Sequence, residues 1–120
     1  MDVASDTDLK QRTKQFAIRI LRLYRSLPPK EEGRVLGRQL LRSGTSIGAN
    51  YRATCRARSR AEFISKLGIV LEEADETVYW LELLVDSGLI SAERLNPLLQ
   101  EANELTAIFV TSLRTSKGIA

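Results

Sequence analysis

Apolar residues recur at intervals of three and four along most of the chain, the spacing of helices that bury one face. The pattern is clearest between Ser59, which opens a Ser-Arg-Ala-Glu capping box, and Gly88, which suits a left-handed cap. Pro28 and Pro29 end an earlier stretch, because a proline pushes the residue before it out of the α region. The periodic stretches predict helices at about residues 8–26, 30–58, 60–86 and 91–114.

Short connections join these stretches, which favours antiparallel neighbours. We therefore predict one all-α domain, an antiparallel up-and-down four-helix bundle over residues 8–114. Residues 1–7 are expected to form a flexible N-terminus and residues 115–120 a frayed tail. The last helix begins either at Ser91 or at Asn96, and the second choice places Pro97 in the favoured first helical position.

The stretch over residues 30–58 contains interior glycines, each of which costs a helix roughly 1 kcal/mol relative to alanine. A break at Gly44-Thr45 would divide this stretch into two helices. One continuous helix is favoured, because its apolar face and its glycine stripe both stay in phase across the glycines.

Composition limits what this bundle can be. The 120 residues suffice for one core, and no apolar run approaches the roughly 20 residues of a membrane span. The polar N-terminus lacks the apolar core of a signal peptide. The single cysteine, Cys55, has no partner for an internal disulfide, so a reducing, cytoplasmic location is expected.

Candidate chemistry is sparse, since histidine is absent and with it the commonest general base and metal ligand. The acidic run from Glu72 to Glu76 is similar to the carboxylate clusters of di-iron bundles, but those sites also need histidines. Cys55 likewise has no histidine to deprotonate it. We therefore predict a non-catalytic protein with no metal site and no cofactor.

Charge is divided unevenly along the chain. Residues 1–70 contain 15 Lys/Arg against 6 Asp/Glu, a net charge of +9, whereas residues 71–120 contain 3 against 9, a net charge of −6. Such a division predicts that one face or one end of the fold is basic.

Arginines follow a helical repeat within residues 30–58. Arg34, Arg38 and Arg42 are four apart, and Arg52 lies 18 residues, or five turns, beyond Arg34. Because a line of arginines suits phosphate backbones, we predict a nucleic-acid surface. Its candidate residues are Arg19, Arg22, Arg25, Arg34, Arg38, Arg42, Arg52, Arg56 and Arg60. The alternatives are a solvated helix edge, arginines paired to the acidic third helix, or a protein-interaction or scaffold module with no nucleic-acid role.

Three longer motifs point to a known family. They are LRSGTSIGANYRA at residues 41–53, ARSRAEFISKL at residues 57–67 and EEADETVYWL at residues 72–81. With them the chain resembles the bacterial four-helix-bundle family encoded by intervening sequences in 23S ribosomal RNA genes, and it is similar to the accessory variability protein of diversity-generating retroelements. The resemblance implies a homopentamer and, as in the retroelement relatives, a basic surface that binds RNA or DNA. At Cys55 the chain departs from the family, in which glycine is frequent.

The resemblance also gives a role to small and polar residues that border the buried face. We expect polar side chains of the second helix to bond to Glu73, Glu76 or Thr77 of the third helix, and the glycines to allow a close helix approach. The residues of this structural motif are Ser43, Gly44, Ser46, Gly48, Asn50, Glu73 and Glu76. An apolar surface around Tyr79, Trp80 and Leu83 is expected to form an interface.

Overall fold

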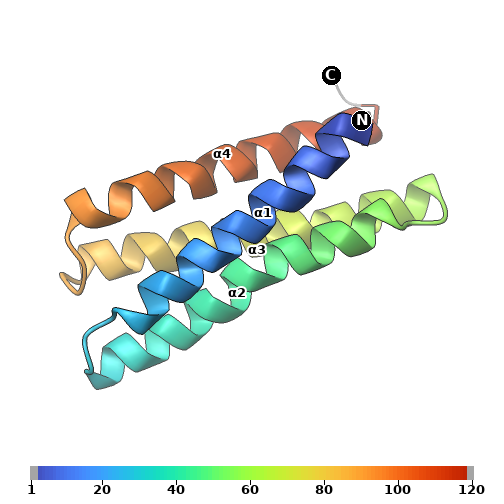
Figure 1. Cartoon of the computed structure of the whole chain (residues 1–120). Helices are drawn as coiled ribbons and strands as arrows, with labels where there is room; N and C mark the ends of the chain where they lie inside the picture. The colour runs from blue at the N-terminus through green and yellow to red at the C-terminus, as the bar shows by residue number, and fades with distance from the viewer. Residues whose placement is uncertain (1–2, 119–120) are drawn as a thin grey trace.

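Four helices make up the part of the chain that the structure, a computed structural model, describes (Figure 1). It describes the backbone of residues 3–118 and the side chains of residues 8–118. The helices are α1 (Val3–Arg25), α2 (Glu31–Cys55), α3 (Arg60–Asp86) and α4 (Ala92–Ser116). None of these helices is long and apolar enough to span a lipid bilayer.

The helices form one elongated bundle of 45 × 24 × 22 Å. Each helix packs against the next in the chain, and α1 closes the ring by contacting α4, whereas the diagonal pairs are not backbone neighbours. Figure 1 shows α1 running between α4 and α2. The predicted all-α, up-and-down four-helix bundle is confirmed.

Two helix ends differ from the predicted ends by more than two residues, and α4 extends to Ser116, into the predicted frayed tail. α1 begins at Val3, earlier than expected, while residues 1, 2, 119 and 120 of the expected flexible ends lie outside the described part of the chain. α2 ends at Cys55 rather than near residue 58, because Arg56 is the C-cap. The helix is continuous across Gly44, which confirms one helix and excludes the alternative break there.

Local signals set the start of the last two helices. The Ser59 side chain accepts a hydrogen bond from the backbone N–H of Glu62 at 3.0 Å, as the capping box predicts. Gly88, which follows α3, has φ +80°, the left-handed conformation expected of it. Ser91 caps α4, so Pro97 lies inside this helix rather than at its first position.

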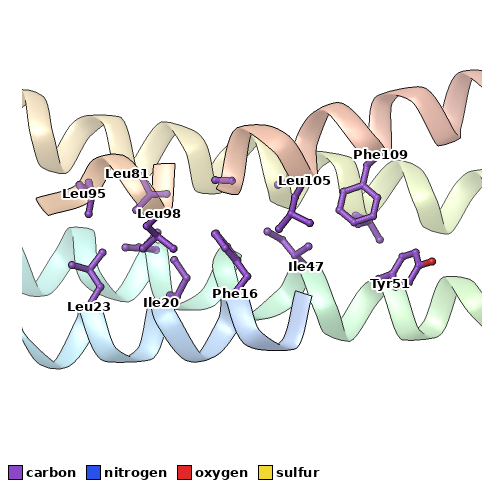
Figure 2. Packing of buried hydrophobic residues seen from close by; sticks show 14 of the residues in the cluster. Phe16, Ile20, Leu23, Ile47, Tyr51, Leu81, Leu95, Leu98, Leu105 and Phe109 are labelled. Atoms are coloured by element: carbon purple, nitrogen blue, oxygen red, sulfur yellow. The ribbon is translucent and has the colours of Figure 1, made fainter. Parts of the chain in front are cut away.

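A continuous apolar core fills the space between the four helices (Figure 2). Phe16 and Ile20 of α1 meet Ile47 of α2 at its centre. Near one end, the rings of Tyr51 on α2 and Phe109 on α4 pack with centroids 5.7 Å apart. These aromatic side chains join α2 and α4, one of the diagonal pairs of helices.

Glycines let α1 and α2 approach closely. A methyl group on Gly44 would lie 2.8 Å from Cγ1 of the buried Ile20, and one on Gly48 would lie 3.1 Å from Oγ1 of Thr13. Both separations are at or below van der Waals contact, so a larger side chain would push the two helices apart. The glycine stripe therefore packs against α1 within the bundle.

We expect Gly44→Ala to lower the free energy of unfolding by about 1 kcal/mol. Crowding of Ile20 costs roughly 1–3 kcal/mol, and the better helix propensity of alanine returns only about 1 kcal/mol of it. Urea denaturation followed by circular dichroism measures the difference.

Gly68→Ala is the matched control, because nothing lies within 4 Å of a methyl group at that position on α3. The same propensity gain, about 1 kcal/mol, should here raise the stability. If both variants were stabilised equally, the close approach of α1 to Gly44 would be wrong.

Candidate nucleic-acid interface

The arginines of α2 occupy two sides of its exposed surface. Gly48 contacts α1, and Arg52 lies one turn further along the same side. Arg34 lies five turns before Arg52, and Arg38 one turn after Arg34, so these arginines follow the edge of α2 beside α1. Arg56 continues this edge as the C-cap.

Arg42 turns to the opposite side, toward α3. Its Nη2 atom lies 3.4 Å from Oε1 of Glu76. The alternative of an arginine paired to the acidic third helix therefore holds for Arg42. Arg34 makes a looser ion pair of 3.9 Å with Glu31 of its own helix. Pairs as exposed as these contribute about 0–1 kcal/mol, so both arginines can exchange partners.

The arginines of α1 do not all extend the α2 edge. Arg12 binds Glu101 of α4 through two hydrogen bonds of 2.8 and 2.7 Å, and Glu104 lies 3.0 Å away. The hydrogen bond to Glu101, in particular, raises the pKa of Arg12. Arg19 follows Arg12 by two turns and is half-buried on the same side, facing α4. Arg22 is exposed.

Arg60 caps the C-terminal end of α4. It is the first residue of α3, and its Nε donates a hydrogen bond of 2.8 Å to the backbone carbonyl of Ser116. That carbonyl belongs to the last turn of α4, where such groups have no partner within the helix. Arg60 therefore does not continue the arginine line of α2.

A groove of about 470 Å³ lies between the first half of α1 and the last half of α2. Lys10 and Lys14 line its α1 side, and Arg52 and Arg56 line its α2 side. The two lysines are not among the residues predicted from the sequence. Their spacing of one turn could have indicated a shared face, but only the packing of α1 on α2 brings them opposite the arginines.

Several exposed arginines of α1, of α2 and at the α2 C-cap have no partner in the part of the chain whose side chains the structure describes. Within residues 8–118, neither an ion pair nor a side-chain hydrogen bond engages Arg22, Arg25, Arg38, Arg52 or Arg56. Their charges remain available for an external anion.

The predicted polar contacts between α2 and α3 are present in part. The hydroxyl groups of Ser43 and Thr77, both buried, form a hydrogen bond of 3.0 Å. The expectation for Ser46 and Asn50 is wrong, since Ser46 donates to the carbonyl of Arg42 and Asn50 to that of Ser46. Both side chains are satisfied one turn back on their own helix, a common alternative for short polar residues.

The carboxylates of the α3 motif have different surroundings. Glu76 accepts hydrogen bonds from Trp80, 3.2 Å away, and from Arg42. Glu73 Oε2 is buried with no hydrogen-bond partner in the described part of the molecule. Burial and the neighbouring charge of Glu76 raise the pKa of Glu73, against an opposing effect of Arg42. Within residues 8–118, no group of three acidic, cysteine or histidine side chains could hold a metal ion.

Comparisons with known proteins agree with the sequence resemblance. A family model for the 23S rRNA-intervening sequence protein matches residues 5–111. The chain is also similar to a crystal structure from Bacteroides thetaiotaomicron, a protein of unknown function from the S23 ribosomal protein family. That similarity has 41% sequence identity and a TM-score of 0.84, and covers 91% of this chain and 97% of the other. No protein with a curated description matches the chain.

We expect Glu73→Gln to stabilise the protein at pH 7. Because the pKa of Glu73 is raised in the folded state, the unfolded chain loses this proton first as the pH rises. The stability of the wild type should therefore fall relative to the variant from about pH 4.3, the ordinary value for glutamate, upward. Denaturation with urea from pH 4 to pH 7 measures the difference between the two proteins.

Glu82→Gln provides the control for this substitution, as Glu82 is an exposed residue of the same helix. Its stability should follow that of the wild type across the pH range. A Glu73→Gln variant that also followed the wild type would contradict the burial of this carboxyl group.

Proposed function

The chain belongs to the 23S rRNA-intervening sequence protein family, and from this premise we propose that it is a non-catalytic protein that binds RNA or DNA through the basic surface of α1 and α2. The proposal depends on one observation, a group of exposed arginines on the α2 edge that have no partner among the side chains of residues 8–118. Arg38, Arg52 and Arg56 are its members.

The distribution of charge supports this proposal. Residues 1–70, which include α1 and α2, have a net charge of +9, whereas the rest of the chain has −6. A surface of one sign attracts polyanions from a distance, and each phosphate that it neutralises releases counterions. Binding of this kind is strong at low salt and weak at high salt.

The aromatic residues support binding to phosphates more than to bases. Among residues 8–118, Tyr79 is the exposed aromatic side chain, and it lies on α3, away from the α1–α2 surface. Sequence-tolerant base binding usually relies on aromatic stacking platforms. We therefore propose contacts to the backbone, with weak sequence preference.

We expect the triple variant Arg38→Gln, Arg52→Gln, Arg56→Gln to lose most of its affinity for structured RNA. Three lost phosphate contacts should also reduce the slope of log K against log salt by roughly 2, at about 0.7–0.9 per contact. Electrophoretic retardation and fluorescence anisotropy over a salt series give both quantities.

The charge-matched control replaces Lys66, Arg94 and Lys117 with glutamine, since these cations lie on α3, on α4 and at its C-cap. It should bind RNA like the wild type. Equal loss in both variants would indicate a nonspecific effect of net charge. A protein partner that is captured from cell extract, resists nuclease and is lost in the arginine variant would instead favour an interaction module.

We further propose that the protein assembles as the homopentamer that the family resemblance implies. Exposed apolar side chains support an interface on α3, where Ile69 is 43% exposed and Tyr79 is 56% exposed. Large apolar side chains exposed on a small bundle are typical of contact surfaces.

Light scattering should give the wild type a mass about five times the 13.5 kDa of one chain. The double variant Ile69→Ser, Tyr79→Ser should shift the mass toward one chain, because it removes apolar surface from the contact. Val110→Ser, an exposed apolar residue on α4, is the control and should leave the mass unchanged. A wild type with the mass of a single chain at micromolar concentration would exclude the pentamer.

A further inference from the structure

We propose that the groove between α1 and α2 holds the phosphodiester backbone of one nucleic-acid strand, with cations from both helices contacting consecutive phosphates. This inference rests on the proposed function and gives it a location. It also adds Lys10 and Lys14, which the arginine pattern of the sequence does not include.

The two walls of the groove have matching spacing. Lys10 and Lys14 are one turn apart on α1, and Arg52 and Arg56 are one turn apart at the end of α2. One helical turn of four residues advances by about 6 Å. Consecutive phosphates along an extended strand follow one another at a comparable interval, so each wall offers one cation per phosphate.

The described residues that line the groove give it a positive charge. Among the described residues that line it, none is acidic, and its four cations make no ion pair or hydrogen bond within the described part of the chain. Positive charges that face one another across a groove repel, and the repulsion is relieved when an anion enters between them. An anionic ligand supplies the negative charge that the described lining residues lack.

The floor of the groove provides room for a chain rather than a closed cage for a small molecule. Gly48 and Ala49 of α2 and Ala17 of α1 have short side chains, and the groove of about 470 Å³ is open to solvent. The Thr13 hydroxyl donates to the carbonyl of Leu9 at 2.7 Å, so it is already engaged within its own helix. Binding in this groove therefore depends on charge and shape.

Base identity has little influence on such a site. The described lining residues include no aromatic side chain on which a base could stack. Phosphate contacts fix the position of a strand but do not read its sequence. We therefore infer that the groove binds strands of different sequence with similar affinity.

The test places a carboxylate in the groove. Ala49→Glu introduces a negative charge on the groove floor, and Ala107→Glu introduces the same charge at an exposed alanine of α4. Fluorescence anisotropy with a fluorescein-labelled single-stranded RNA of mixed sequence should show a loss of at least about tenfold in affinity for Ala49→Glu, because like charges oppose the phosphates. Ala107→Glu should bind within about twofold of the wild type. Circular dichroism of both variants reports that the helices are intact.

A second pair of variants tests the lysines. Lys10→Gln with Lys14→Gln should reduce the salt slope for single-stranded RNA by about 1.4, that is, about 0.7 for each contact. The control, Lys66→Gln with Lys117→Gln, also removes two positive charges, but from residues that do not line the groove, and it should leave the slope unchanged.

A wild type that does not bind RNA at all would overturn the proposed function. A wild type whose RNA binding is unaffected by Ala49→Glu and by the loss of Lys10 and Lys14 would overturn the groove alone.

Discussion

Close packing of α1 on the glycines of α2 is the constraint on which the rest of this surface depends. Gly44 and Gly48 leave the space that Ile20 and Thr13 occupy, although each glycine costs the helix about 1 kcal/mol relative to alanine. Helices that approach so closely bury their apolar side chains fully, as the complete burial of Ile20 and Ile47 indicates. This packing offsets the cost in helix propensity. It also fixes how the exposed edge of α1 faces the exposed edge of α2.

The basic groove follows from the same packing. Gly48 forms part of the groove floor and also contacts α1 through Thr13. Because the residues between the two helices are small there, the groove stays open, with the lysines of α1 on one wall and the arginines of α2 on the other. Residues that pack the bundle and cations of the proposed anion site thus alternate along the same two helices.

Local features of the fold were predictable from the sequence, whereas contacts between distant segments were predictable only in part, as with the hydrogen bond between Ser43 and Thr77. Periodicity predicts the four helices and the unbroken course of α2 across Gly44, and the Ser59 cap follows from a short motif. Periodicity does not distinguish a polar side chain that bonds across helices from one that bonds within its own helix. For this reason the predicted hydrogen bond from Asn50 to α3 is wrong, and Asn50 donates to the carbonyl of Ser46 instead. Periodicity also does not reveal the ion pair between Arg12 and Glu101, which are 89 residues apart. Nor does it show that the lysines of α1 lie across the groove from the arginines of α2.

The topology explains which cations remain without partners. The two basic helices, α1 and α2, contact each other. On its other side α1 contacts α4 and α2 contacts α3, and both of these neighbours are acidic. Arginines on the outer sides of this pair meet carboxylates, as Arg12 meets Glu101 and Arg42 meets Glu76. On the inner sides, Arg34 pairs with Glu31 of its own helix, whereas the four cations that line the groove meet no carboxylate among residues 8–118. Among residues 8–118, the uncompensated charge of the groove therefore follows from the order of the helices, which places the two basic helices side by side.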